Sequence, residues 1–371
     1  MKKYLALIFA AILMVSLFLA GCGNSADKGN NKTSEKTEKS VVSTTTQEEK
    51  FLFTADEGGS ITKISVKEQK VISTIEAEGA VHNIQVSPDG KVVAVTVVPE
   101  MNDHGESSDD GNEESSEDGH DDSMKMNGKA LFFDSATDKL IKEVEVGNHP
   151  AHIVFTDDGK YVLVTNNEDN NVSVINSKDY SVVETIPTGK RPHGFRVSKD
   201  SQFAYVANMG EDTVSVLNLI SFKEEKKIKV GETPVTTGIT TDNKSLVVTL
   251  NKENSLAIVD LESEKIEKVT VGTGPAQVYI QPDDQFAYVA NQGTEVSPSN
   301  SLSKVDLQSK KVVATIETGN GSHGVITSPD NKFTYVTNMF EDTLSIIDNS
   351  QNRVIKTLTV GKIPNGISIM P

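Results

Sequence analysis

The sequence predicts an all-β fold, a seven-bladed β-propeller of four-stranded antiparallel blades, from three observations. One phrase recurs along the chain, and its clearest copies end at Asn166, Asn208, Asn291 and Asn338. Weaker copies bring the number of units to seven. Each unit holds four short stretches rich in β-branched residues, separated by Asp, Asn, Gly and Ser. Such stretches are typical of antiparallel strands joined by tight turns.

The spacing of the units is regular apart from one interval. The seven copies end at residues 56, 97, 166, 208, 251, 291 and 338. Five of the six intervals lie between 40 and 47 residues, and the sixth, of 69, indicates an insertion over residues 99–127. The third unit shows the expected strands, at residues 152–156, 161–165, 172–176 and 182–186. No helical periodicity occurs in the repeats, so we expect strands throughout.

The ends of the repeat region predict how the ring closes. The folded part, expected over residues 51–371, begins at Phe51 in the second strand of a blade. It finishes with Gly366-Ile-Ser-Ile-Met370, which has the character of a first strand. We therefore expect the C-terminal strand to complete the N-terminal blade, which removes an open sheet edge.

The N-terminal segment predicts export and anchoring. Two lysines precede an apolar run over residues 4–20, which ends in Leu19-Ala20-Gly21-Cys22. This ending resembles the lipobox of bacterial lipoproteins, which implies a signal peptide over residues 1–21 and a lipidated Cys22. Residues 22–50 are polar and are expected to form a disordered tether. The sequence thus predicts an extracytoplasmic protein anchored to the cell membrane.

Composition excludes several classes of function. The net charge is −17 and the chain has only three arginines, so nucleic acid is not an expected partner. One cysteine excludes intrachain disulfides, four-cysteine zinc sites and cysteine-ligated iron–sulfur clusters. The absence of a Cys-x-x-Cys-His motif excludes covalently attached c-type haem.

The recurring phrase resembles the YVTN family of propeller repeats. Tyr335-Val336-Thr337-Asn338 carries the resemblance, together with Ser87-Pro-Asp-Gly90 and Ser328-Pro329-Asp330. It covers roughly residues 50–371 and departs from WD-type repeats, because the chain has no Trp. The family implies a fold rather than a function, since propellers host many unrelated activities.

The propeller fold implies that two sets of loops share the channel face: those entering the innermost strand and those joining the second strand to the third. His82, His193 and His323 occupy one equivalent position at the entries of innermost strands, with Asn365 as a fourth. Three imidazoles at a channel mouth can bind a metal, an anion or a cofactor. The alternative is that a crowded turn simply tolerates polar residues. The three histidines belong to blades 2, 4 and 7, which are not neighbours.

Two further histidines lie near these strand entries, and acids follow several second strands. His152 is one position along in its strand, and His149 precedes it in the same loop. The acids include Glu168-Asp169, Glu211-Asp212 and Glu341-Asp342. We interpret these acids as turn residues and their solvated neighbours rather than as ligands.

The insertion over residues 99–127 is the other candidate metal-binding segment. It contains eleven acidic residues, three Met, His104 and His120, and carries more than half of the net charge. It resembles the acidic, His-containing loops of extracytoplasmic metal-binding lipoproteins, which implies a divalent metal ion. The alternative is a solvated acidic loop without a ligand. The candidate metal ligands are therefore His82, His193, His323, His104 and His120.

The sequence thus favours a non-enzymatic protein that binds a ligand, with a divalent metal as the candidate, on its channel-mouth face. An oxidoreductase or a lactonase is the alternative, because the YVTN resemblance extends to d1-haem, quinoprotein and lactonase propellers. His193 and His323 would serve as haem ligands, whereas a lactonase would use His193 with Arg191 or Arg196. No c-haem domain, nucleophile elbow or phosphate loop supports an enzyme. A third alternative is a cell-surface scaffold for another protein.

Overall fold

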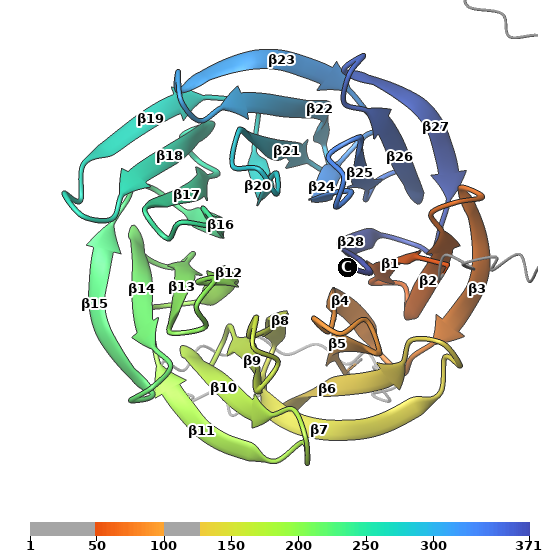
Figure 1. The fold of residues 1–371 in the computed structure, drawn as a ribbon, viewed down its shortest axis with the longest axis vertical. Helices are drawn as coiled ribbons and strands as arrows, with labels where there is room; N and C mark the ends of the chain where they lie inside the picture. The colour runs from red at the N-terminus through yellow and green to blue at the C-terminus, as the bar shows by residue number, and fades with distance from the viewer. Residues whose placement is uncertain (1–48, 100–126) are drawn as a thin grey trace, which may run out of the picture. The chain divides into compact units, whose positions relative to one another are not determined.

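The computed structural model describes residues 49–99 and 127–371, which contain 28 strands in seven four-stranded antiparallel sheets. The sheets follow one another around a central channel, with the innermost strand of each blade facing that channel (Figure 1). The predicted seven-bladed propeller is therefore confirmed. Within these two ranges we find no helix long and apolar enough to cross a membrane.

Each blade is described from its innermost to its outermost strand. Blade 1 contains β28 (Pro364–Ile369), β1 (Phe51–Asp56), β2 (Ser60–Ser65) and β3 (Lys70–Glu76). Blade 2 contains β4 (Ala80–Val86), β5 (Val92–Val98), β6 (Asn127–Asp134) and β7 (Leu140–Asn148). Blade 3 contains β8 (Pro150–Phe155), β9 (Tyr161–Asn166), β10 (Asn171–Asn176) and β11 (Val182–Pro187).

The other four blades repeat this order. Blade 4 contains β12 (Pro192–Val197), β13 (Phe203–Asn208), β14 (Thr213–Asn218) and β15 (Lys223–Lys229). Blade 5 contains β16 (Pro234–Ile239), β17 (Ser245–Leu250), β18 (Ser255–Asp260) and β19 (Ile266–Thr270). Blade 6 contains β20 (Pro275–Ile280), β21 (Phe286–Thr294), β22 (Ser297–Asp306) and β23 (Lys311–Glu317). Blade 7 contains β24 (Ser322–Thr327), β25 (Phe333–Asn338), β26 (Thr343–Asp348) and β27 (Arg353–Thr359).

The ring closes through the first blade, as the sequence predicts. Strand β28 pairs antiparallel with β1, and the register places Leu52 opposite Ile369 and Ala55 opposite Gly366. The C-terminal strand therefore supplies the innermost strand of a blade whose other three strands are N-terminal. Without β28 the edge of β1 would be unpaired, and an open strand edge of this kind promotes association with other chains.

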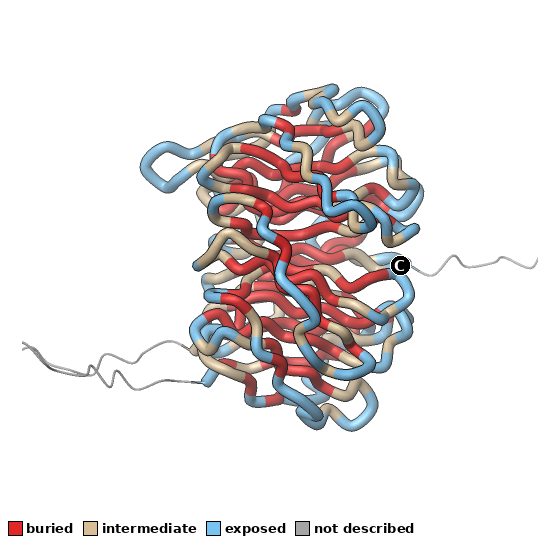
Figure 2. The backbone as a smooth tube through the Cα atoms, turned by 90° about the vertical axis from the view of Figure 1, so that its left-hand side faces the viewer, coloured by how far each residue is buried: buried red, intermediate tan, exposed pale blue. Residues whose placement is uncertain are grey.

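The apolar core is divided into layers that lie between neighbouring blades. Phe53 and Ile61 of blade 1 pack with Val95 of blade 2, and Phe195 of blade 4 packs with Leu163 of blade 3. Seven clusters of this kind occur among the described residues. Most residues of the strands inside the ring are buried, whereas the turns are exposed (Figure 2). A chain with 5% aromatic residues and no Trp can build thin layers of this kind.

The Asn that ends the recurring phrase has a structural role. Asn208 Nδ2 donates hydrogen bonds to Thr213 Oγ1 and Ser215 Oγ, at 3.0 and 2.9 Å. Asn338 makes the same two bonds in its blade, and its Oδ1 accepts one from Gly319 N at 3.1 Å. The amide therefore ties the second and third strands to the loop that enters the innermost strand of the same blade. Satisfying these buried groups explains why the phrase recurs.

Several sequence predictions fall outside the described residues. These are the signal peptide over residues 1–21, the lipidation of Cys22, nearly all of the tether over residues 22–50, and His104 and His120 of the insertion. The insertion separates β5 from β6, which are the second and third strands of blade 2.

Candidate functional site

The site is built at the first residues of the innermost strands. In blade 4, Pro192 pairs with Asn208, but the next pair joins Phe195 to Val206, so His193 and Gly194 are left out of the ladder. The same irregularity occurs in the innermost strand of every blade. Such bulges re-aim a side chain. His82, His193, His323 and Asn365 all occupy this irregular position, which confirms their predicted equivalence.

Glycine after the histidine allows neighbouring blades to approach closely. A Cβ on Gly194 would lie 2.8 Å from Val235 O, and one on Gly324 would lie 2.5 Å from Asn365 O. As a result, His193 Nδ1 lies 3.3 Å from Val235 O and His323 Nδ1 lies 3.2 Å from Asn365 O. Both rings are thus held by the backbone carbonyl of the equivalent residue in the next blade.

Two histidines from non-adjacent blades meet across the channel mouth. His82 Nε2 of blade 2 lies 3.4 Å from His193 Nε2 of blade 4. Their ring centres are 5.5 Å apart and the rings are nearly perpendicular, at 87°. The structure therefore brings together two of the three predicted ligands. His323 makes no such contact with them and bonds instead to Gln277 and Asn365.

The hydrogen bonds at Nδ1 assign the roles of the two facing Nε2 atoms. His82 Nδ1 lies 2.7 Å from Glu57 Oε1, and Asn365 Nδ2 donates to the same oxygen at 2.7 Å. Because both oxygen partners only accept, His82 and His193 donate from Nδ1, and whenever both rings are neutral each turns the lone pair of Nε2 outward. Two lone pairs 3.4 Å apart repel each other. A proton or a cation between them makes the contact favourable.

A third histidine lies beside this pair. His152 of blade 3 is 1% exposed, and neither of its ring nitrogens has a hydrogen-bond partner among the described residues. Its ring centre lies 4.9 Å from that of His193 and 6.3 Å from that of His82. Buried polar atoms are normally paired, so two orphaned nitrogens on one ring point to a missing partner.

His149 lies further out in the same loop. Its ring centre is 6.4 Å from that of His82, and its Nδ1 lies 3.7 Å from Glu168 Oε1. The side chain is partly exposed. We therefore place it at the rim of the histidine cluster, which consists of His82, His152 and His193.

The surroundings keep most of these imidazoles neutral. Burial lowers the pKa of His193 to about 3. Burial lowers the pKa of His323 to about 4 and that of His152 well below its ordinary value. Burial alone would raise the pKa of Glu57, but its hydrogen bond and attraction to His82 outweigh that effect and lower it. Neutral rings beside an ionised carboxylate form a donor set suited to a cation.

The cluster is not a complete metal site as it stands. No three His, Cys, Asp or Glu side chains within residues 49–99 and 127–371 are arranged so that they could hold one metal ion. Two facing nitrogens and their supporting acceptors are in place, whereas the ring of His152 would have to turn toward them.

Glu57 is the site residue that the sequence analysis missed. It directly follows Asp56, at which the first copy of the recurring phrase ends. In other blades the residue after the Asn also lies at the channel mouth, since Asn167 Nδ2 donates to Pro192 O at 3.2 Å. An acidic residue directly after the recurring phrase was the sequence feature that could have identified Glu57. The acids predicted to be turn residues behave differently, because Glu211 accepts from Thr213 Oγ1 at 2.6 Å within its own turn.

The two arginines considered for a lactonase lie apart from the histidine pair. Arg191 is exposed at the loop, with its Nε 3.5 Å from Asn167 Oδ1. Arg196 lines a cavity inside the channel, three residues beyond His193. Neither forms a hydrogen bond with His193 in the described part of the chain.

Comparisons with solved structures agree with the fold. The chain is similar to a structure titled hydrazine synthase of Kuenenia stuttgartiensis, with a TM-score of 0.64 and 19% identity over 78% of this chain and 90% of that one. It is also similar to dihydro-heme d1 dehydrogenase NirN in complex with DHE, with a TM-score of 0.59 and 14% identity over 85% of this chain and 74% of that one. At such identities the likeness extends to the fold alone. A search of curated proteins found no match.

Family models match most of the chain. The model of the YNCE-like β-propeller matches residues 295–370, which confirms the predicted kinship with propeller repeats. The model of the choice-of-anchor I domain matches residues 33–274, well over half of the sequence. The chain therefore belongs to the choice-of-anchor I domain family.

Proposed function

We propose that this propeller binds a divalent metal ion at its channel mouth, with His82 and His193 as the first two ligands and His152 as the third. The observation that carries the proposal is the 3.4 Å separation of the two facing Nε2 atoms. In a tetrahedral site with Zn–N bonds of about 2.0–2.1 Å, two ligand nitrogens lie about 3.3 Å apart. The pair therefore has the spacing of one edge of a zinc coordination tetrahedron.

The outer contacts of the pair support the same proposal. Metal-binding histidines usually donate their other ring N–H to a carboxylate or a backbone carbonyl, which fixes the tautomer and the ring orientation. His82 has Glu57 in this role and His193 has Val235 O. Nitrogen ligands of this kind suit Zn²⁺, Cu²⁺ or Ni²⁺ better than Ca²⁺ or Mg²⁺.

The remaining parts of the proposal rest on the sequence. We place the protein outside the cytoplasm, held to the membrane by lipidated Cys22, with the tether over residues 22–50 carrying the propeller. The acidic insertion over residues 99–127, with His104 and His120, would capture cations more weakly. Its charge would raise the local concentration of cations near blade 2. The proposed position outside the cytoplasm would also allow the propeller to bind a protein partner.

The enzymatic alternatives have less support. The two similar solved structures are related to this chain through fold alone. The channel cavity lined by Arg196 and Tyr279 has a volume of about 280 Å³. Ligand pockets range over about 300–1,000 Å³, so this space suits a small ligand better than a macrocycle. We therefore keep the non-enzymatic proposal, and a d1-haem, quinoprotein or lactonase activity would show first as visible absorbance or turnover.

Metal titration tests the proposal directly. Elemental analysis and calorimetric titration with Zn²⁺ would be made on the chain from Gly23 onward and on His82→Gln, His193→Gln and His152→Gln variants. We expect micromolar or tighter binding of one ion, weakened at least about 100-fold when either His82 or His193 is replaced. Glu57→Ala, which removes an orienting acceptor, should weaken binding about 10- to 100-fold.

Two matched variants separate this site from other modes of binding. His323→Asn replaces an equivalent histidine by the residue that blade 1 carries there, and should leave affinity unchanged. Deletion of residues 102–126 should remove only weak additional binding. Loss of all binding in the deletion, with His82→Gln unaffected, would mean surface capture by the insertion. No binding in any variant would contradict the metal proposal and favour a protein scaffold.

A further inference from the structure

A polar cavity occupies the channel beyond the histidine cluster. It has a volume of about 280 Å³ and is lined by residues from six of the seven innermost strands. Asn83 and Ile153, which follow His82 and His152, lie at its histidine end, and Ser87 and Pro329 lie at the other. A second cavity of about 190 Å³ shares Arg196 with it.

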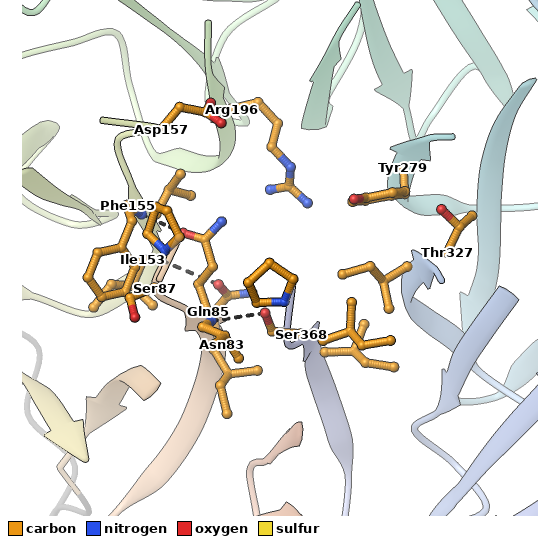
Figure 3. A pocket seen from close by; sticks show the side chains of 18 of the residues that line it. Asn83, Gln85, Ser87, Ile153, Phe155, Asp157, Arg196, Tyr279, Thr327 and Ser368 are labelled. Carbon is orange, nitrogen blue, oxygen red and sulfur yellow. Dashed lines mark hydrogen bonds between the residues drawn. The ribbon is translucent and has the colours of Figure 1, made fainter. Parts of the chain in front are cut away.

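Arg196 is the charged group of this cavity. Its side chain extends from β12 into the open space between Gln85 and Tyr279 (Figure 3). Of its five N–H donors, one is hydrogen-bonded, from Nη1 to the carbonyl of Phe195 at 2.9 Å. No carboxylate forms an ion pair with it within residues 49–99 and 127–371, since Asp157, on the same wall, is paired with Lys199.

The lack of a counter-charge costs free energy. Burial lowers the pKa of Arg196, which reports a cation that has lost water without gaining an anion. Arg196 is half-buried in the channel, and a guanidinium removed from water is normally paired or fully hydrogen-bonded, because desolvation of an unpaired charge is expensive. The arrangement becomes favourable once an oxyanion occupies the cavity.

A second polar group in the cavity also lacks a partner. The hydroxyl of Thr327, at the end of β24, is buried and has no hydrogen-bond partner among the described residues. The amide of Gln85 accepts from Phe155 N through its oxygen, which leaves its NH₂ group as a donor. Thr327 and Tyr279 lie on the opposite side of the cavity from Gln85 (Figure 3). Donors therefore line two sides of the space into which Arg196 extends.

Blade 5 leaves room beside the guanidinium. By the repeat, Gly238 of β16 is the equivalent of Arg196 in the next blade, and it lines the second cavity together with Tyr279. Gly238 therefore contributes no side chain to the second cavity, which Arg196 and Tyr279 also line.

We propose that the channel cavity binds a small organic or inorganic oxyanion, a carboxylate or a phosphate, with the guanidinium of Arg196 as its main anchor. Arginine binds such groups through two parallel N–H···O bonds, a geometry that lysine cannot reproduce. The hydroxyls of Thr327 and Tyr279 and the amide of Gln85 complete the donor set. Since the chain is acidic overall, with a net charge of −17, an anion gains nothing from the global field and must be held by these local groups. This proposal does not depend on the metal site.

Calorimetric titration of the full chain with malonate and with inorganic phosphate, at low chloride concentration and with EDTA present, tests the assignment. We expect at least one of the two anions to bind with a Kd below about 1 mM. Arg196→Gln should weaken that binding at least about tenfold. Arg196→Lys keeps the charge but loses the two parallel N–H donors, and should weaken binding by a smaller factor. The relative affinities for malonate and phosphate identify which oxyanion the cavity prefers.

Arg353→Gln is the matched control. Arg353 is exposed on the outermost strand β27, with its Nε bonded to Gln351 Oε1 at 2.6 Å, so this variant removes the same charge far from the channel. It should bind the anion like the native chain. Thr327→Val, which removes an unpaired hydroxyl, should fold normally and bind the anion about three- to tenfold more weakly. The proposal is overturned if neither anion binds below about 10 mM, or if Arg353→Gln lowers affinity as much as Arg196→Gln.

Discussion

His323 shows that the role of a histidine at the channel mouth depends on its hydrogen-bond partners. It occupies the same irregular strand position as His82 and His193, and its Nδ1 lies 3.2 Å from Asn365 O and 3.3 Å from Gln277 Nε2. No ionised carboxylate bonds to it, whereas His82 has Glu57. We therefore interpret His323 as a neutral structural residue of the channel mouth and His82 as a ligand.

This interpretation predicts a stability change with pH. Burial lowers the pKa of His323 from its ordinary 6.5 to about 4, so below pH 6.5 the unfolded chain binds protons that the folded chain does not. The stability contributed by the neutral ring is thus complete above about pH 6.5 and falls as the pH drops toward 4. We expect His323→Asn to reduce the loss of unfolding free energy between pH 7.5 and 4.5 by about 2 kcal/mol.

Urea unfolding of both chains at the two pH values, in the presence of EDTA, measures this difference. His149→Gln serves as the comparison, because His149 is partly exposed and should change the loss less. An equal pH dependence in the native chain and in His323→Asn would show that the ring is protonated in the folded state.

The sequence could predict part of the candidate site at this scale. The equivalence of His82, His193 and His323 follows from the repeat, because equivalent positions in a propeller converge on the channel. The 3.4 Å contact does not follow, since it depends on the channel width and on the bulge that re-aims each ring. The sequence could not predict that Arg196 lacks an ion-pair partner either, because this depends on which side chains the other six blades place opposite it.

At the scale of elements, two buried lysines connect neighbouring blades. Lys63 of β2 is 4% exposed, and its Nζ donates to Ser135 O at 2.8 Å and to Asp138 Oδ1 at 2.7 Å, both in blade 2. The ammonium also lies 4.4 Å from the centre of the Phe51 ring. Lys304 of β22 repeats the arrangement toward blade 7. Each lysine adds a buried polar contact between two neighbouring sheets.

We expect Lys63→Met to destabilise the fold by about 2–4 kcal/mol, because the change leaves Asp138 Oδ1 and the buried carbonyl of Ser135 without their donor, while Ser73 Oγ still donates to Asp138 Oδ2. Lys226→Met removes an exposed pair with Glu264 and should cost less than about 1 kcal/mol. Urea unfolding of the two variants compares them. Equal and small effects would show that Lys63 fills space without contributing through its charge.

The strands were the part of the structure that the sequence predicted most accurately. In the third unit, the expected strands at residues 152–156 and 161–165 correspond to β8 and β9, whose bounds differ by no more than two residues. Alternation of β-branched residues and the Asp-Gly, Asn and Ser clusters carry this information locally. The lysine contacts between blades could not be predicted from local sequence, because the partners of Lys63 lie 72 and 75 positions further along the chain.

For the whole molecule, the closing strand is the decisive element. Deleting residues 366–371 would remove most of β28 and expose the inner edge of β1. We expect this variant to unfold at lower temperature or to self-associate through that edge. Deletion of Pro371 alone leaves β28 intact and is the control. Scanning calorimetry with size-exclusion chromatography makes the comparison, and an unchanged melting curve would show that the ring does not need its last strand.

Ring closure could be predicted because the repeat region begins at Phe51 in a second strand and finishes with a first strand. The placement of the candidate metal site relative to that closure could not, because Glu57 was not recognised. Asn365 on β28 donates to Glu57, and the two residues are 308 positions apart.

This hydrogen bond lies at the seam where the ring is joined, and Glu57 in turn orients His82. Bringing such distant segments together costs about 5 kcal/mol of chain entropy, so the seam forms late, after the blades between have folded. Until β28 pairs with β1, Asn365 cannot donate to Glu57, whose carboxylate bonds to His82. The hydrogen-bonded support of His82 is therefore complete only when the first blade has received its last strand.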